Sequence, residues 1–360
     1  MLVWSDNQIP KFSEGYGYTP DRLWDFIGTS GLPIRRSKPT NWQEIGRLQM
    51  PPDLAMLNGL GIGYMEKDDC TGEIIINHSV PDAFIESRVY SVGYTFWETN
   101  RLPQTWVDLC NKMDEVWTCS VAMAEVFAES GVKRPIHEFK LGVDPKIYYP
   151  ELRTGHSTFT FLSIGSPSSR KNSQMAVDAF LKLYEGNNNY RLIYKTNGEQ
   201  DARIYRGDEM HPLRHPQIEV IDDELSHADL GKVFDMADCV IYPTSGEGWG
   251  NLPFQAIGKG IPTICTDVLA CTEFAHMSVP LDFEWSTWKM HGRYENCGQW
   301  AKPDFDDLCD KMQWVAHNYN QIAEKTYHSA LYIAENMTWE KVSQKYINRS
   351  WEILKELGKI

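Results

Sequence analysis

Residues 238–266 carry the pattern that most restricts the fold, two short apolar runs separated by a glycine-rich loop and a short helical segment. The runs are DCVIYP at 238–243 and IPTICT at 261–266. Continuous apolar runs of this length are typical of parallel strands buried on both faces. Between them, Pro253 near the start and Gly260 just past the end predict a helix of about two turns. The segment therefore predicts a strand–loop–helix–strand unit.

The loop of this unit places Glu247 among glycines, directly before the predicted helix. A helix N-terminus presents unpaired backbone N–H groups and the positive end of the helix dipole, which together favour an anion. Alternatively, the glycines only form the bend of an ordinary strand-to-helix turn. The stretch alone leaves both interpretations open.

The same alternation of strand and helix runs through the rest of the chain, which indicates doubly wound parallel sheets. Further predicted strands lie at 73–80, 90–97, 115–119, 157–165, 190–195 and 218–221. Further predicted helices lie in the segment that begins at Gln104, at 120–131, 173–186 and 225–237, and from 304 onward.

A chain of 360 residues is long enough for two domains. The extended, proline-containing segment at 135–151 is the predicted linker. We expect a Rossmann-like domain at 1–145, a second at 146–340, and a C-terminal helix at 341–360 that packs back towards the first. The carboxyl ends of the strands in both sheets would then face a central cleft, where ligands bind in such folds.

Composition narrows the class of protein. No apolar stretch approaches the roughly 20 residues of a membrane-spanning helix, and no secretory signal is visible. The eight cysteines contain no CxxC pair, which favours reduced thiols and a cytoplasmic location. The net charge of −14 argues against nucleic acid as a partner.

Arg170 and Lys171 end the loop that follows the predicted strand at 157–165, so they should lie at the same sheet edge as Glu247. Two cations and a helix N-terminus suit a phosphorylated ligand. The alternative for Arg170 and Lys171 is a solvated surface pair. From its residues alone, we interpret the chain as an α/β protein that binds a phosphate ester.

The second half resembles the donor-binding domain of the retaining family-four glycosyltransferases, which have the GT-B fold. The resemblance extends from about Ile74 to the C-terminus and is most specific around Glu247. It is carried by SIG at 163–165 with Lys171 six residues after Gly165, EGWG at 247–250, NLPFQAIGKGIPTICTD at 251–267, YTFWETNRLPQTWVDLCNKMDEVWTCS at 94–120 and LGVDPKIYYPE at 141–151.

The resemblance implies a hexosyltransferase-type enzyme (EC 2.4 class) that moves a sugar from a nucleotide-diphosphate sugar to an unidentified glycan, lipid or protein acceptor. It implies retention of anomeric configuration, with neither a metal nor a cofactor. Its catalytic residues would be Glu247 on the donor-sugar hydroxyls, Lys171 on the diphosphate and His78 near the reacting sugar. His78 could equally be a structural histidine.

The remaining expected site residues divide into a donor set and an acceptor set. The donor-binding residues would be Gly165, Arg170, Gly248, Trp249, Gly250, Asn251, Leu252 and Gln255. The acceptor side would include Gly15, Gly17 and Glu98, although Glu98 could simply pair with Arg101.

Two positions depart from the family pattern. Ser166 stands where the family often has Arg, and Gln255 replaces the second signature Glu, so ribose hydroxyls would lose a charged acceptor. These departures keep two alternatives open, a GT-B sugar-nucleotide epimerase and a binding module without turnover.

The tripeptide Asp304-Phe305-Asp306 matches the DxD metal-binding pattern of the other large transferase fold. It follows Pro303 and precedes an apolar periodic segment, so we interpret it as an acidic helix start and predict no metal site.

Overall fold

The computed structural model describes residues 2–6, 18–37, 74–84, 89–166, 168–196, 203–206, 209–290 and 292–360. The chain divides into two compact units, which are considered separately below. Unit 1 comprises Met1–Trp97, Arg101–Gly142 and Trp339–Ile360, and unit 2 comprises Glu98–Asn100 and Val143–Thr338. The change between Gly142 and Val143 lies three residues before the predicted domain boundary.

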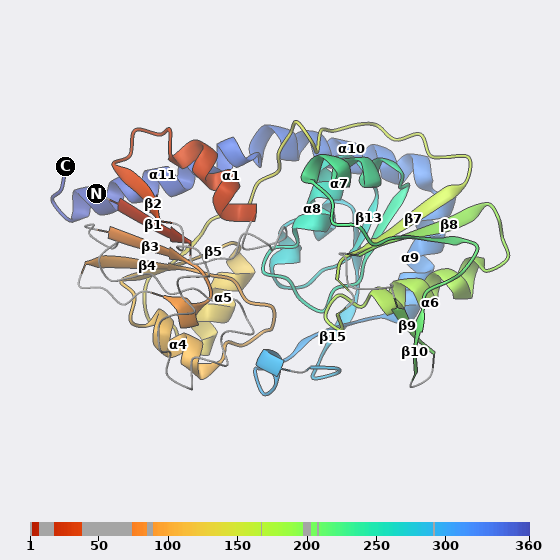
Figure 1. The fold of residues 1–360 in the computed structure, drawn as a ribbon, viewed down its shortest axis with the longest axis horizontal. Coiled ribbons are helices and arrows are strands. Elements are labelled where there is room, and N and C mark those ends of the chain that lie inside the picture. Colours follow the sequence, from red (N-terminus) through yellow and green to blue (C-terminus); the bar gives the residue numbers. More distant parts are fainter. Residues whose placement is uncertain are drawn as a thin grey trace. The chain divides into compact units, whose positions relative to one another are not determined.

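Unit 1 is built on a parallel sheet whose described strands run in the order β2-β1-β3-β4-β5-β6 (Figure 1). The strands are β1 (Leu2–Asp6), β2 (Ile34–Ser37), β3 (Ile74–His78), β4 (Tyr90–Tyr94), β5 (Glu115–Thr118) and β6 (Ile136–Glu138). The helices are α1 (Tyr18–Ile27), η3 (Pro81–Ala83), α4 (Gln104–Cys110), α5 (Val121–Ser130) and α11 (Trp339–Glu356).

Helix α5 begins and ends where its sequence predicts. The Ser120 hydroxyl accepts a hydrogen bond from the backbone N–H of Met123, which satisfies one of the free donors of the first turn. Gly131 ends the helix with a φ of 110°, a conformation that glycine adopts without steric cost.

The C-terminal helix α11 packs within unit 1 and is held there by buried polar contacts. Glu115 on β5 is completely buried, and its Oε2 lies 2.7 Å from the Nη2 of Arg349 on α11. Trp117 Nε1 donates to the other carboxylate oxygen at 2.6 Å. The hydroxyls of Tyr94 and Tyr346 are 2.6 Å apart, which joins α11 to β4 as well.

Unit 2 contains a second six-stranded parallel sheet, in the order β11-β8-β7-β12-β13-β14. Its strands are β7 (Phe159–Ile164), β8 (Tyr190–Lys195), β11 (Ile218–Ile221), β12 (Cys239–Tyr242), β13 (Thr263–Thr266) and β14 (Val279–Leu281). Its helices are α6 (Ser173–Tyr184), α7 (His227–Asp235), α8 (Asn251–Gly258), η4 (Leu269–Glu273), η5 (Ala275–Met277), η6 (Gly292–Tyr294), α9 (Phe305–His317) and α10 (Tyr319–Asn336).

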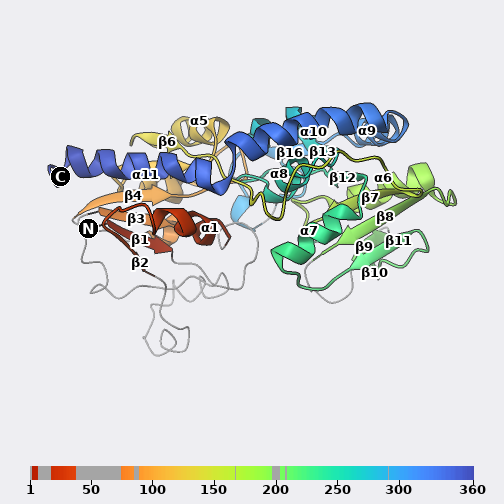
Figure 2. The same cartoon turned by 90° about the horizontal axis from the view of Figure 1, so that it is seen from above.

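Helices cover both faces of this sheet, so its central strands are buried as their apolar sequences require. Helices α6 and α9 pack on one face around Phe161, Phe180 and Met312, while α7 and α8 lie on the other (Figures 1 and 2). All four residues of β12 and all four of β13 are buried. A sheet covered in this way binds ligands only at its strand ends.

The strand order of unit 2 fixes where such a ligand binds. Numbered along unit 2, the strands run 3-2-1-4-5-6, so successive connections from β7 and β12 turn away from each other. In open α/β sheets the crevice at this reversal, outside the carboxyl ends of the two strands, is the usual ligand site. The loops after β7 and β12 carry Arg170, Lys171 and Glu247.

Two antiparallel hairpins, which the sequence patterns did not predict, extend from unit 2. They are formed by β9 (Arg203–Arg206) with β10 (Glu209–Pro212) and by β15 (Phe283–Ser286) with β16 (Trp300–Pro303). The second hairpin is anchored to the site loop, because Ala301 N donates to the Ser245 carbonyl at 2.8 Å.

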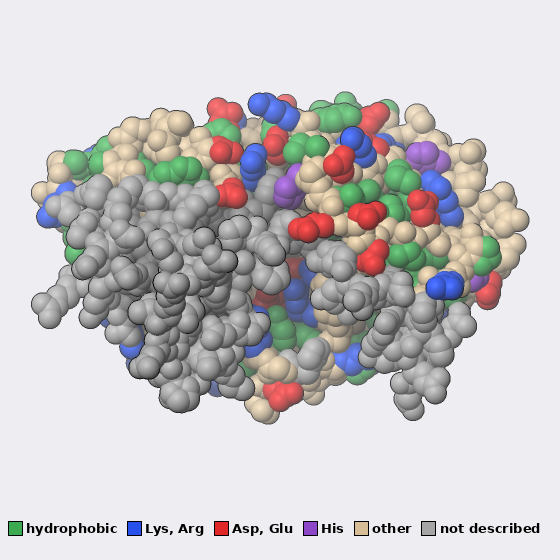
Figure 3. All heavy atoms as spheres, in the orientation of Figure 1, with side chains coloured by type: hydrophobic (Ala, Val, Ile, Leu, Met, Phe, Trp, Pro, Cys, Tyr) green, Lys and Arg blue, Asp and Glu red, His purple; other side chains and the backbone are tan. Residues whose placement is uncertain are grey.

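The surface around α7 is charged with both signs. Lys232 lies 2.8 Å from Asp229, and Arg153 lies 2.7 Å from Asp235. Figure 3 shows acidic and basic side chains interspersed on this face of unit 2. Locally paired charges of this kind are typical of a solvated surface. Within the described part of the chain, no helix combines the length and apolar character needed to cross a membrane.

Candidate active site

The loops that follow β7 and β12 are bonded to each other. Ser245 N donates to the carbonyl of Arg170 at 2.7 Å. The Asn172 amide donates to the Pro243 carbonyl at 2.9 Å and to the Ser245 hydroxyl at 2.8 Å. Asn172 has a φ of 50°, a left-handed conformation that asparagine tolerates better than most residues. These contacts fix the side chains of Arg170 and Lys171 against the Glu247 loop.

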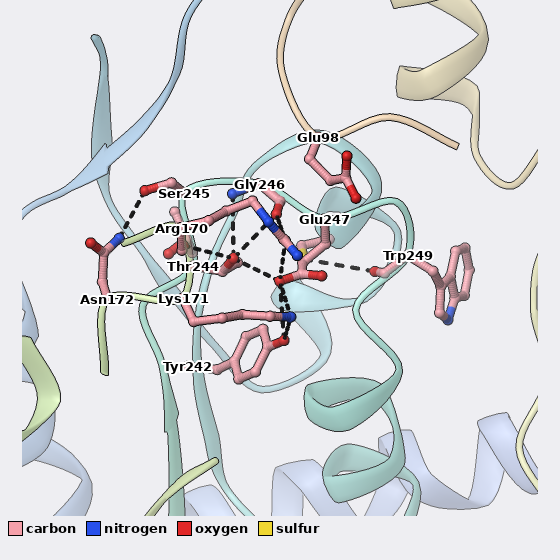
Figure 4. Close-up of polar contacts among 12 residues, drawn as sticks. Glu98, Arg170, Lys171, Asn172, Tyr242, Thr244, Ser245, Gly246, Glu247 and Trp249 are labelled. Atoms are coloured by element: carbon pink, nitrogen blue, oxygen red, sulfur yellow. Dashed lines mark hydrogen bonds and ion pairs between the residues drawn. The ribbon is translucent and has the colours of Figure 1, made fainter. Parts of the chain in front are cut away.

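Four donors converge on one oxygen of Glu247 (Figure 4). Its Oε1 lies 2.7 Å from Lys171 Nζ and 3.0 Å from Arg170 Nη1, and it accepts from the hydroxyls of Thr244 at 2.8 Å and Tyr242 at 3.0 Å. The other oxygen, Oε2, has no hydrogen bond to any residue that the structure describes. Glu247 is only 6% exposed, so this oxygen is an ordered acceptor available to a ligand.

The charges on Glu247 and Arg170 are stable over the physiological pH range. Burial raises the pKa of Glu247, but Arg170, Lys171 and the hydrogen bonds from Lys171 and Thr244 outweigh it and bring the pKa to about 2. Burial lowers the pKa of Arg170, yet Glu247, Tyr294, Glu98 and Tyr242 raise it well above its ordinary value. Glu247 and Arg170 therefore stay charged near neutrality.

Lys171 is held by the strand ends on both sides. Its Nζ donates to the Tyr242 hydroxyl at 2.5 Å and lies 5.1 Å from the centre of the tyrosine ring. Gly165, at the end of β7, has a φ of 140°, and a Cβ there would lie 3.6 Å from the Lys171 side chain. The cation is therefore positioned by a glycine turn and an aromatic ring.

The first turn of α8 lies directly after the Glu247 loop. Its N-cap is Gly250, with a φ of 91° and no side chain to satisfy the N–H groups of Asn251 and Leu252. Trp249 is buried beside Phe254 and Phe274, which holds the loop from Gly248 onward against the domain core. Uncapped N–H groups on a fixed loop suit a phosphate.

Gln255 lies on the second turn of α8 and is 2% exposed. Its Oε1 finds no hydrogen-bond donor within the described residues. A buried amide oxygen without a donor costs about 1–3 kcal/mol of folding free energy. Such a group is typical of a position reserved for a ligand, as expected if it accepts from a ribose hydroxyl.

His78 lies at the carboxyl end of β3 in unit 1 and has no exposed surface. Its ring stacks on Tyr94 with centroids 4.3 Å apart and meets Trp4 edge-on at 5.8 Å. In this structure His78 packs as an aromatic core residue, and its contact with a sugar stays a prediction. Gly15 and Gly17 lie outside the described residues.

Glu98 follows β4 in sequence but belongs to unit 2. Its Oε2 accepts a hydrogen bond from the Tyr294 hydroxyl at 3.2 Å. Tyr294 comes from the turn of the β15–β16 hairpin, which no sequence pattern had connected to the site.

Asp304-Phe305-Asp306 starts a helix, as interpreted from the sequence. Asp304 is the N-cap of α9 and accepts from Asp307 N at 2.9 Å, while Asp306 pairs with Lys182 at 3.0 Å. No three His, Cys, Asp or Glu side chains in the described ranges are grouped as metal ligands would be.

Other site residues escaped the sequence patterns. Asn172, Tyr242 and Thr244 stand next to predicted site residues, but only the three-dimensional contacts show that they bind Glu247 or join its loop to the other. The available signal was position, because Tyr242 ends β12 and Thr244 follows it just before the glycine loop.

Two parallel Rossmann-like sheets, one of which carries a cation–carboxylate cluster and an uncapped helix start at its strand reversal, are the architecture of the GT-B fold. Residues 118–346 match the family described as "Family 4 Glycosyltransferase in conflict systems", and the chain belongs to this family. The expected fold, family and enzyme class are thereby confirmed.

Solved structures support the fold. A glycosyltransferase from Rickettsia africae matches with a TM-score of 0.67 at 12% identity, covering 98% of both chains. Sucrose-phosphate synthase from Thermosynechococcus elongatus matches with a TM-score of 0.67 at 11% identity, covering 99% of both chains. WaaG, a glycosyltransferase involved in lipopolysaccharide biosynthesis, matches with a TM-score of 0.61 at 10% identity, covering 97% of this chain and 99% of its own. No match was found among curated proteins.

Proposed function

We propose that this glycosyltransferase retains the anomeric configuration of the transferred sugar, uses no metal, and binds its donor between the β7 and β12 loops of unit 2. The observation that carries the proposal is the arrangement around Glu247. One carboxylate oxygen is held by two cations and two hydroxyls, while the other is left open to a sugar hydroxyl.

The donor diphosphate would take over part of the cation pairing. Arg170 and Lys171 have Glu247 as their ionic partner in the structure. A diphosphate at the start of α8 offers them a second anion and gains the uncapped N–H groups of Asn251 and Leu252. The same cations then stabilise the charge that develops on the leaving diphosphate.

Retention follows most simply if the leaving diphosphate takes the proton of the acceptor hydroxyl on the face from which it departs. Glu247 would hold the hydroxyls of the transferred sugar as positive charge develops on its ring. Gln255 would accept from the ribose. His78 would contact the reacting sugar only if its ring turned out of the Tyr94 and Trp4 cluster.

Binding provides the first test. A thermal-shift panel of UDP, GDP, ADP and their sugars should raise the melting temperature with at least one nucleotide, because a ligand of the folded state stabilises it by mass action. Lys171→Ala should abolish most of that shift and lower transfer by at least about a hundredfold. Lys182→Ala, an exposed lysine on α6, is the matched control and should behave like the parent.

Transfer chemistry provides the second test. Turnover in excess EDTA should equal turnover with added Mg²⁺ or Mn²⁺, and NMR of the product should show the anomeric configuration of the donor. Activity that disappears in EDTA and returns with metal would contradict the metal-free proposal. An inverted product would contradict retention without affecting the donor site.

A further inference from the structure

Three residues that precede Arg101 in the sequence are built into unit 2. The Thr99 hydroxyl donates to the Cys297 carbonyl at 2.8 Å, Asn100 N donates to the Gln299 carbonyl at 2.9 Å, and Gln299 N donates to Asn100 Oδ1 at 2.7 Å. These bonds join the segment to the β15–β16 hairpin and fix the backbone that follows Glu98.

The Glu98 backbone also rests on the loop that carries Glu247. A Cβ on Gly246 would overlap the Glu98 carbonyl oxygen, so glycine at 246 is what allows the two segments to approach. Figure 4 shows Glu98 and Tyr242 on opposite sides of Glu247. Glu98 is therefore held beside the donor machinery by contacts within one unit.

The side chains around Glu98 form a polar group that the donor site described above does not use. Tyr294 donates to Glu98 Oε2, and Glu98 Oε1 has no hydrogen bond to any residue that the structure describes. Glu98 and Glu247 thus each have one carboxylate oxygen open to a ligand.

We propose that Glu98, oriented by Tyr294, binds hydroxyl groups of the transferred sugar beside those held by Glu247. The inference rests on the proposed function, which puts the donor sugar at Glu247. A carboxylate oxygen only accepts, and the Tyr294 oxygen can accept as well through its lone pairs while its O–H donates to Glu98. Neighbouring hydroxyls on a sugar ring supply the donors that these atoms need.

The donor sugar is favoured over the acceptor as the ligand because Glu98 lies against the Glu247 loop. The Glu98 carbonyl oxygen lies so near Gly246 that a Cβ there would overlap it, so a ring that reaches the open oxygen of Glu247 is close to Glu98. Glu98 then becomes a specificity residue for the transferred sugar, whereas the sequence suggested a place on the acceptor side.

Calorimetry with the nucleoside diphosphate and the sugar nucleotide selected by the thermal-shift panel tests this subsite. Glu98→Ala should weaken the sugar nucleotide about tenfold, the value of one hydrogen bond to a charged group. Its affinity for the nucleoside diphosphate should stay unchanged or rise slightly, because a negative charge near the phosphates is lost. Glu98→Gln keeps an acceptor oxygen, so its affinity for the sugar nucleotide should lie between those of the parent and Glu98→Ala.

Tyr294→Phe removes the orienting hydroxyl without changing charge and should weaken the sugar nucleotide a few-fold. Tyr332→Phe, at an exposed tyrosine on α10, is the control and should bind like the parent. If the Glu98 and Tyr294 variants lose equal affinity for the diphosphate and the sugar nucleotide, or lose none for either, the subsite is overturned even if the parent binds its donor. A parent that binds no nucleotide would overturn the proposed function and the subsite together.

Discussion

At the scale of single residues, the site is organised by oxygens that lack a donor. Glu247 keeps Oε2 open, and Gln255 keeps a buried Oε1 without a partner. Folding free energy is lost at such atoms and is recovered when a ligand supplies the missing hydrogen bond. Residues of this kind can be separated experimentally from structural ones, because stability and binding should respond to substitution in opposite directions.

Gln255→Leu exploits that difference. Leucine fills a similar volume and removes the unsatisfied oxygen, so we expect the free energy of unfolding of the empty protein to rise by about 1 kcal/mol. The affinity for the nucleotide should fall, because the ribose loses its acceptor. Urea unfolding and calorimetry measure the two quantities. A variant that is less stable and binds equally well would show that Gln255 is structural.

At the scale of elements, the two site loops act as one piece because Asn172 joins them. Its amide bonds reach Pro243 and Ser245, and its left-handed backbone turns the chain into α6. The loop after β7 can therefore hold Arg170 and Lys171 in place before any ligand arrives.

Replacing Asn172 separates these two contributions. Asn172→Gly keeps the left-handed backbone and loses the amide bonds, which should cost about 1 kcal/mol of folding free energy together with some donor affinity. Asn172→Ala should cost about 1 kcal/mol more, because a Cβ is strained at positive φ. Urea unfolding of the parent and both variants checks the order. If Asn172→Gly is as stable as the parent, the amide bonds of Asn172 do not contribute to the folding free energy.

The elements that sequence predicts well here are those with local signals. Strands β12 and β13 follow from buried apolar runs, α5 from Ser120 and Gly131, and the Glu247 loop from its glycines. The β15–β16 hairpin has mixed, partly exposed residues and no turn signature, so its alternation was not recognised. The placement of Glu98 beside Tyr294 depends on long-range contacts that no local pattern encodes.

At the scale of the whole molecule, the stability of unit 1 depends on how α11 is attached to its sheet. Glu115 is the centre of this attachment and is surrounded by Arg349, His137, Tyr90 and Trp117. Burial raises its pKa, but the hydrogen bonds from His137, Arg349 and Trp117 and the charge of Arg349 lower the pKa to about 2.

A pH series on the parent and Glu115→Gln tests this attachment. Because the folded pKa is about 2 and the reference pKa is 4.5, the ionised carboxylate stabilises the fold above pH 4.5. That stability, about 3 kcal/mol, is lost as the pH falls from 4.5 towards 2. The difference in unfolding free energy between parent and variant should therefore narrow on acidification.

The Glu115→Gln comparison isolates one carboxyl, because Glu247 titrates in both proteins and cancels. Glu340→Gln, an exposed position on α11, is the control and should follow the parent at every pH. A difference that stays constant between pH 3 and 7 would show that Glu115 has an ordinary pKa.

The discontinuity of unit 1 has a consequence for how the chain is made. Unit 2 is encoded almost entirely by one continuous stretch, residues 143–338, whereas unit 1 lacks α11 until residues 339–360 have been synthesised. A chain emerging from the ribosome can thus assemble its donor-binding sheet first. The Glu115–Arg349 and Tyr94–Tyr346 contacts form only after α11 has been synthesised. Unit 1, whose synthesis begins first, is therefore the unit completed last.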